Sequence, residues 1–504
     1  MTGTTPGTTA PENSAVAQLD KKSDRYFLAA APIWRALIHL CAPMIAAVSV
    51  GAIYNLINAG FIGSLHSTPL LAAITFGLPI LPLMMAVGGV FGVGGSTMVS
   101  RLMGAADQAA KTAGSPAGVA TTGARHESES QGQIRRVVGF TIWGAILAGI
   151  LIGAICLVLL DPIVHLLGAD AAAFAPTEQY VGVTLAFFPV LALAFALEQL
   201  VRAEGASTAS MIGLIASTIG NLVFDVLFIL VLHWGVLGAA LAVGISNLIA
   251  VGYYLWFLRT RSVNGIRLSP RWFSVKPAIM KEVFGVGASE LLMSSFMIVT
   301  TLLLNNLAVR YGDSLLAGVG VGLRIVQVPE FLVMGITLGV LSLFAYTFGA
   351  GDKARLRAAI RTSLFTIGGI TIVFSGLVFV FREQVLSWFT ADPDVLRNGT
   401  LFLTAQLVAT VFNGATGLLI AVFQGTGKMR AATIMGIAQG VLFIPVVLLA
   451  NLWFGLVGLI WAMTVTEVLT LAVALVLYRI ERPTEAEPTA DEIEAAAELV
   501  GEPA

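Results

Sequence analysis

Long apolar segments recur along this chain of 504 residues and constrain its fold more than any other feature. They lie near residues 36–59, 70–99, 137–160, 180–201, 208–232, 236–258, 282–309, 315–346, 360–381, 400–422, 431–451 and 455–479. Each can cross a lipid bilayer as a helix, which takes about 20 residues. Only 11% of the residues are charged, whereas a soluble domain carries about 25%. We therefore predict an all-α integral membrane protein of about twelve transmembrane helices.

The distribution of Lys and Arg independently supports an even number of helices. With the N-terminus inside the cell, 24 of the 28 basic residues fall on the cytoplasmic side of the predicted helices. The opposite side receives Arg310, Arg382 and Arg397, and Arg324 falls within a predicted helix. Basic residues accumulate in short cytoplasmic loops. We therefore expect a multi-pass protein of the cell inner (plasma) membrane with both termini in the cytoplasm.

The second half of the chain repeats the first. A shift of 245 residues places Leu70, Leu71, Ala72, Gly77, Gly94, Gly104, Ala105 and Asp107 on Leu315, Leu316, Ala317, Gly322, Gly339, Gly349, Ala350 and Asp352. Further on, Gly205, Ala209, Ile212, Gly235, Gly238 and Ala242 match Gly427, Ala431, Ile434, Gly455, Gly458 and Ala462. Both copies begin on the same side of the membrane, so the predicted fold has two parallel six-helix repeats. The matched small residues suit close packing of helices.

These features divide the chain into five parts. We predict a cytoplasmic N-terminal tail (1–35), an N-lobe (36–258), a cytoplasmic linker between the lobes (259–280), a C-lobe (281–479) and an acidic disordered tail (480–504). Within the N-lobe, residues 105–133 are rich in Ala, Gly, Thr and Ser and predict a flexible insertion, since the matching loop after Asp352 is far shorter.

The order and spacing of several segments resemble the multidrug and toxic compound extrusion (MATE) family over nearly the whole stretch 36–479. They include APMIAAVSVGAIYNLINAGFIGSL (42–65), VSRLMGAAD (99–107), LVRAEGASTASM (200–211), STIGNLVFDVLFIL (217–230), HWGVLGAALAVGIS (233–246) and GLRIVQVPEFLVMGITLGVLSLFAYTFGAGDKARLR (322–357). The pattern is most similar to the prokaryotic branch that includes the DNA-damage-inducible F-like proteins. The resemblance implies V-shaped lobes and an antiporter that exports organic, often cationic, compounds in exchange for H+ or Na+, without a cofactor.

One acid in the middle of a predicted N-lobe helix is the leading candidate for coupling. Asp225 follows Asn221 by four residues, so both side chains lie on one face of the helix. An acid within the membrane is costly and is a functional candidate by default. The alternative is a structural role, in which a neutral Asp225 forms a hydrogen bond to a neighbouring helix.

The resemblance assigns Asn221 and Asp225 to a cation site of the N-lobe. It also reveals two departures from the branch pattern. Asn58 stands where the first helix typically carries an acid, and Val243 stands where a later helix often has Thr. One carboxylate and one hydroxyl are therefore missing, which leaves the coupling ion open between H+ and Na+.

Other polar residues within the apolar segments are secondary candidates, either for a substrate chamber or for a polar network in the C-lobe. They are Tyr54, Glu290, Arg324, Glu330 and Glu467. Glu467 aligns with Asn247 of the first half and is either a second proton carrier or a packed neutral acid. Glu198, which lies near Arg202, is expected to be solvated or paired at the membrane interface.

The remaining function classes have little support. The histidines stand apart, with no second ligand at metal spacing, and no P-loop or hydrolase motif is present. We therefore expect no metal site and no enzymatic activity. A net charge of -1 offers no basic patch for nucleic acid. The expected partners are small organic substrates and the lipid bilayer, with no obligate protein partner evident. A flippase for lipid-linked precursors is the closest alternative, followed by an integral-membrane enzyme.

Overall fold

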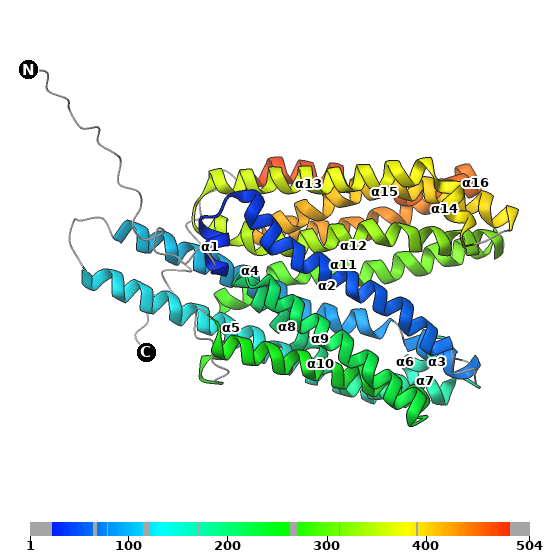
Figure 1. Ribbon diagram of the computed structural model, residues 1–504, viewed down its shortest axis with the longest axis horizontal. Helices are drawn as coiled ribbons and strands as arrows, with labels where there is room; N and C mark the ends of the chain where they lie inside the picture. The colour runs from blue at the N-terminus through cyan, green and yellow to red at the C-terminus, as the bar shows by residue number, and fades with distance from the viewer. Residues whose placement is uncertain are drawn as a thin grey trace, which may run out of the picture.

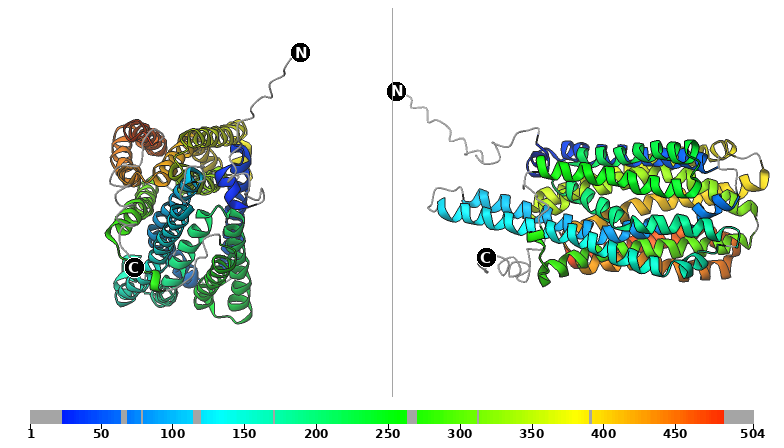
Figure 2. Two further views of the ribbon diagram at one scale, coloured as in Figure 1. Left: turned by 90° about the vertical axis from the view of Figure 1, so that its left-hand side faces the viewer. Right: turned by 90° about the horizontal axis from the view of Figure 1, so that it is seen from below.

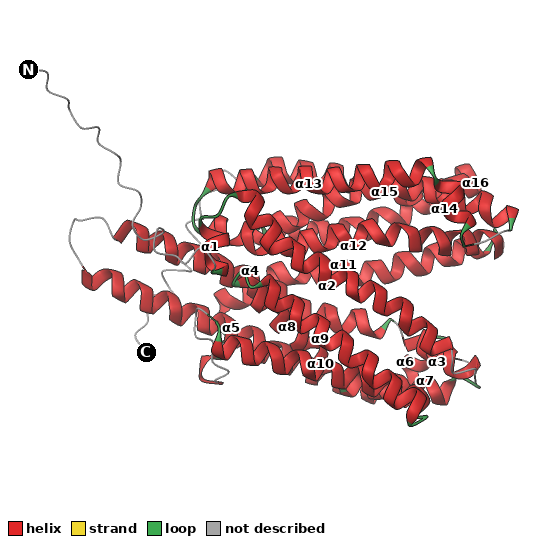
Figure 3. Ribbon diagram, viewed as in Figure 1, coloured by secondary structure: helices red, strands yellow, loops and turns green. Residues whose placement is uncertain are grey.

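The computed structural model describes residues 23–63, 68–77, 79–113, 120–169, 171–262, 270–311, 313–389 and 392–483. Within these residues the chain consists of helices and short connections, with no strand (Figure 3). The first half contains α1 (Asp24–Ala29), α2 (Ile33–Gly63), α3 (Thr68–Gly77), α4 (Ile80–Ala113), α5 (Ala120–Val158), α6 (Leu160–Leu166), α7 (Phe174–Ala186), α8 (Phe188–Ala203), α9 (Ser207–Asp225), η1 (Val226–Val231) and α10 (Gly235–Thr260). The short η2 (Pro270–Trp272) precedes α11 (Pro277–Val309), α12 (Asp313–Gly349), α13 (Lys353–Val380), α14 (Arg382–Ser387), α15 (Pro393–Gly425) and α16 (Met429–Glu481).

Local sequence explains where several of these helices begin. The carboxylate of Asp352 accepts a hydrogen bond from the backbone N–H of Arg355 at 2.8 Å, which caps α13. The carboxylate of Asp392 does the same for Asp394 at 2.8 Å, and Pro393 occupies the first turn of α15. The first N–H groups of a helix have no partner within the helix, so the caps satisfy groups that would otherwise be unpaired. Proline has no N–H and therefore leaves none unpaired at this position.

The 53-residue α16 is two helices that fold back on each other. Its backbone leaves helical geometry at Gly455, where φ is 57° and ψ is -131°. Gln439 donates a hydrogen bond to Glu467 at 2.8 Å. In a straight helix these residues would be about 42 Å apart, at 1.5 Å per residue. The two parts of α16 on either side of Gly455 are therefore separate passes through the membrane.

With this division, the structure has the predicted number of spans. Ten helices in the described residues are long and apolar enough to cross a membrane, and α7 with α8 forms one further pair, bent by 49°. Counting α16 twice gives twelve passes, six in each half. The all-α membrane fold is thus confirmed.

Glycines that the repeat matches have the same backbone geometry in both halves. Gly235 and Gly455 both have a φ of 57°, and Gly205 and Gly427 have φ values of 81° and 69°. This left-handed region favours glycine, because a side chain would be strained there. At these four positions the matched glycines make turns, in addition to the close packing that the sequence suggested.

The two lobes lie close together at one end and diverge toward the other. In Figure 1 they meet near α1 and separate toward α6 and α14, and Figure 2 shows the bundle from two further sides. Helices α2 and α4 of the N-lobe pack against α12, and α4 also packs against α11. Helices α4 and α12 cross closely, since a Cβ on Gly104 would collide with the carbonyl of Tyr346 and one on Gly349 with that of Arg101.

Polar contacts join the lobes at the end where they meet. Asp107 on α4 accepts hydrogen bonds from Arg25 of α1 and from Tyr346 of α12. Arg101 on α4 forms an ion pair with Glu282 on α11. The guanidinium of Arg355 donates to carbonyls of the chain around α1, at 2.7 Å for Ala31. The short α1 is therefore held between both lobes.

The boundaries of the predicted parts differ from the structure in two places. The insertion predicted at 105–133 is helical at both ends, because α4 continues to Ala113 and α5 begins at Ala120. The predicted N-terminal tail contains α1 and the start of α2, and Leu28 within it is buried. The middle of the linker (263–269) and the end of the acidic tail (484–504) lie outside the described residues.

Candidate functional site

Asp225 lies at a change of helix geometry within the N-lobe. It is the last residue of α9, and the chain continues directly into η1, a π-helix over Val226–Val231. Such wide turns interrupt α-helices mostly as short segments and are frequent at functional sites. The acid is 2% exposed, and Asn221 one turn earlier is also buried.

A phenol from another helix completes this site. The hydroxyl of Tyr54 on α2 donates to the carboxylate of Asp225 at 3.1 Å and makes a second contact with the side-chain oxygen of Asn221. Sequence analysis placed Tyr54 with the substrate chamber, but the structure places it beside the coupling candidates. The residue also connects α9 to α2, which packs against α12 of the other lobe.

A hydroxyl on α10 joins the same cluster. The amide nitrogen of Asn221 donates to Ser246 at 3.2 Å, and the Ser246 hydroxyl donates to the carbonyl of Val243 at 2.9 Å. Sequence analysis noted that Val243 lacks the hydroxyl of the branch pattern but missed Ser246. The signal was available, because Ser246 follows Val243 by one helical turn. We name Tyr54, Asn221, Asp225 and Ser246 the N-lobe cluster.

Asn58, the third residue predicted for this site, follows Tyr54 by one turn on α2. Its side chain lies outside the described part of the structure. The i, i+4 spacing places the two residues on one face of α2. Its membership of the N-lobe cluster stays a prediction.

Two acids and two amides come together in the C-lobe. Glu467, in the second half of α16, accepts hydrogen bonds through one carboxylate oxygen, Oε1, from Gln439 at 2.8 Å and Asn413 at 3.3 Å. Glu330 on α12 lies near enough for its charge to interact with that of Glu467. We name Glu330, Asn413, Gln439 and Glu467 the C-lobe cluster.

The other predicted residues lie apart from both clusters. Glu290 on α11 accepts a hydrogen bond from Gln424 of α15 at 2.9 Å, and its stem packs where α4 has Gly89. This places Glu290 at the contact between the lobes. Arg324 is exposed on α12. Six residues separate it from Glu330, so the two point about 120° apart around the helix axis.

Glu198 forms an ion pair with Arg202. The guanidinium of Arg202 donates to the Glu198 carboxylate at 2.7 Å. Both side chains are buried rather than solvated. A buried ion pair between neighbouring turns of one helix is a structural feature and a weak candidate for transport.

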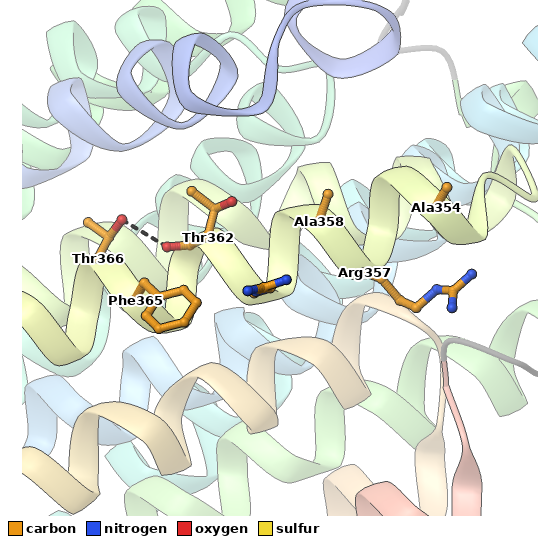
Figure 4. A pocket seen from close by; sticks show the side chains of 7 residues that line it. Ala354, Arg357, Ala358, Thr362, Phe365 and Thr366 are labelled. Carbon is orange, nitrogen blue, oxygen red and sulfur yellow. Dashed lines mark hydrogen bonds between the residues drawn. The ribbon is translucent and has the colours of Figure 1, made fainter.

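A shallow hollow on the surface lies apart from all of these acids. It follows one face of α13 near its start (Figure 4). Its lining residues are Ala354, Arg357, Ala358, Arg361, Thr362, Phe365 and Thr366. Because a single helix lines it and no acid faces it, we do not assign the hollow a part in coupling.

Two helical lobes that bury acids within the membrane form the architecture of a secondary transporter. The family model MatE matches residues 115–227 and 286–449. The multidrug export protein MepA of Staphylococcus aureus (strain MSSA476) is 33% identical over 462 residues, which cover 91% of this chain and 96% of the relative. The MepA of Staphylococcus saprophyticus matches to the same extent. The chain belongs to the MATE family of transporters and is not an enzyme.

Solved structures agree with this fold. A multidrug resistance MATE family transporter in an outward-facing conformation matches with a TM-score of 0.79 at 20% identity, over 95% of this chain and 100% of the other. A MATE transporter in a bent conformation matches with a TM-score of 0.80 at 21% identity, over 94% of this chain and 99% of the other. At this level of identity the likeness concerns the fold alone.

Proposed function

We propose that this protein is a multidrug exporter of the cell inner membrane, with both termini in the cytoplasm. It exchanges organic, often cationic, compounds for H+ or Na+ by alternating access. The similarity to MepA proteins, which are named for multidrug export, supports the substrate class. The lobes, which meet at one end and diverge at the other, support a site that opens to one side of the membrane at a time.

The observation that carries the coupling proposal is the N-lobe cluster. Asp225 is 2% exposed and has no basic partner in that cluster. A charged carboxylate in such a position is costly, so binding a cation there stabilises the protein. Tyr54 belongs to α2, which contacts the C-lobe helix α12, so a change at the acid can reach the interface between the lobes.

The identity of the ion is part of this proposal. Four side chains form the N-lobe cluster and Asp225 is its only acid. Sites for metal cations commonly combine more than one charged oxygen ligand. A proton needs one carboxylate and little space. We therefore favour H+ as the ion that binds at Asp225.

Purified protein in proteoliposomes tests the proposal directly. We expect ethidium, a fluorescent organic cation, to accumulate when an outward H+ gradient is imposed across the vesicle membrane. A Na+ gradient without a pH difference should have little effect. Uptake that responds to neither gradient, in correctly inserted protein, would contradict antiport.

A further inference from the structure

We propose that Glu467 in the C-lobe cluster is a second proton-binding site, separate from Asp225. The two sites would give the transporter one proton carrier in each lobe. This inference extends the proposed function and rests on it for one of the two measurements described below.

The hydrogen-bond donors at Glu467 are all on one side of its carboxylate. Gln439 and Asn413 both donate to Oε1, while Oε2 is buried with no partner in the described structure. The side chain is 9% exposed. One oxygen is therefore fixed in position by two amides, and the other is left without a donor or an acceptor.

The side chains bonded to Glu467 are uncharged. Around this acid, α15 and the first half of α16 contribute the amides Asn413 and Gln439. The charge of Glu467 acts on another acid, Glu330 of α12. The acids of α11 face other partners, because Glu290 is bonded to Gln424 and Glu282 to Arg101.

Two acids without a basic partner cannot both remain ionised at low cost. A proton bound at Oε2 removes one of the charges. Because Oε2 is buried, a hydrated ion does not reach it, whereas a proton requires almost no space. These constraints favour H+ over Na+ or an organic cation as the species that binds at Glu467.

Glu330 is the acid on a helix that reaches the other lobe. Its side chain is exposed, in contrast with that of Glu467. It lies on α12, which packs against α2 and α4 of the N-lobe and so borders the space between the lobes. When the charges of two acids interact, the ionisation of one affects proton binding at the other. The ionisation of Glu330 therefore influences proton binding at Glu467.

A direct measurement of protonation tests this site without any transport. Infrared difference spectra of the full-length protein in nanodiscs, recorded from mildly acidic to mildly alkaline pH, detect the C=O band of protonated carboxylic acids. Glu467→Gln should remove one component of that band, and the component should persist in Asp225→Asn. The matched control is Glu383→Gln, because Glu383 is exposed on α14.

If the Glu467→Gln spectra overlay those of the wild type, the proposal is wrong and Glu467 is a packed acid that does not titrate. If Glu467→Gln fails to fold, Gln439→Leu keeps the acid and removes one N–H donor. That variant should move the titration of the same component to higher pH, because a donor to the charged form is lost. An unmoved titration would also overturn the proposal.

The second measurement counts the coupled protons. Proteoliposomes with the membrane potential clamped at zero are loaded to a steady ethidium gradient against a difference of about one pH unit. Each coupled proton multiplies this gradient about tenfold. We expect about 100-fold in the wild type and about tenfold in Glu467→Gln, with Glu383→Gln equal to the wild type.

The steady gradient does not depend on the number of active molecules, so a merely structural defect would slow its approach and leave its size unchanged. An unchanged gradient in Glu467→Gln would overturn the second site. Failure of the proposed function is distinguishable, because the wild type itself would then build no gradient while the infrared measurement still reports on Glu467.

Discussion

The N-lobe and the C-lobe each bury an acid, but they hold it in different ways. Asp225 lies on α9 and is bonded to Tyr54 of α2, a helix at the lobe interface. Glu467 lies in the second half of α16 and is bonded to amides of α15 and of the first half of α16. The N-lobe acid is thus linked directly to a helix that contacts the other lobe.

This difference suggests that the acids of the two lobes have different roles in transport. A proton that arrives at Asp225 changes the hydrogen bonding of Tyr54 and can alter the position of α2. A proton at Glu467 changes the hydrogen bonds to Asn413 and Gln439 within the C-lobe, and no hydrogen bond joins Glu467 to an N-lobe helix in the described structure. We expect the N-lobe cluster to control whether transport occurs and the C-lobe cluster to control how much energy drives it.

Asp225→Asn is the change with the largest expected effect. It removes the acid of the N-lobe cluster and preserves its size and hydrogen-bonding capacity. Gradient-driven ethidium uptake should fall to the level of empty vesicles, with normal purification yield and helix content. Uptake at the wild-type rate would show that Asp225 is not essential and that the essential coupling site lies in the C-lobe.

Tyr54→Phe should have the next largest effect. It removes the hydroxyl that donates to Asp225 and also contacts the side-chain oxygen of Asn221. A hydrogen bond to a charged group contributes about 1.5–3 kcal/mol, so we expect uptake to fall by about tenfold or more. The matched control is Tyr311→Phe, whose hydroxyl donates to Asn451 at 2.6 Å away from both clusters. Equal uptake in the two variants would show that the Tyr54 hydroxyl on α2 has no part in coupling.

Asn58→Asp sharpens the comparison by adding an acid to the N-lobe. If its side chain lies beside Asp225, as the family pattern implies, the two acids cannot both ionise readily. The pH dependence of uptake should then shift, or a dependence on Na+ should appear. The check is uptake against pH, with and without Na+, in the wild type, both single variants and the Asn58→Asp, Asp225→Asn double variant. A profile that overlays the wild type would place Asn58 outside the cluster.

Ser246→Ala should have the smallest effect. The hydroxyl accepts a hydrogen bond from Asn221 at 3.2 Å and does not touch Asp225. Losing one neutral hydrogen bond costs about 1 kcal/mol, which corresponds to about a fivefold slower uptake. Ser262→Ala, outside the transmembrane helices, provides the control. A loss as large as that of Asp225→Asn would mean that the hydroxyl binds the ion itself.

Sequence reasoning predicted the number of helices, the repeat and the pairing of Asn221 with Asp225. These features depend on local patterns: apolar length, matched glycines and i, i+4 spacing. It did not predict Ser246, Asn413 or Gln439 as partners of the acids. These residues lie on other helices, and helices that are apolar on nearly every side give no sign of which face meets a neighbour.

Tyr54 also shows that sequence alone does not reveal which face of a helix meets which neighbour. It was recognised as notable but assigned to the substrate chamber, because the rotation of α2 about its axis cannot be read from composition. The 53-residue α16 shows what a local signal can still provide. Gly455 matched Gly235 in the repeat, and the structure gives both the same φ of 57°.

The π-helix that follows Asp225 has a consequence for motion. In a π-turn the hydrogen bond spans one more residue than in an α-turn, so η1 holds a surplus residue in the register of the helix. If Val226–Val231 regained α-helical bonding, that residue would be expelled and the part of the helix that carries Asp225 would turn by about 100° relative to the part beyond. The carboxylate would then leave Tyr54 and face a different neighbour, by rearrangement of the backbone alone.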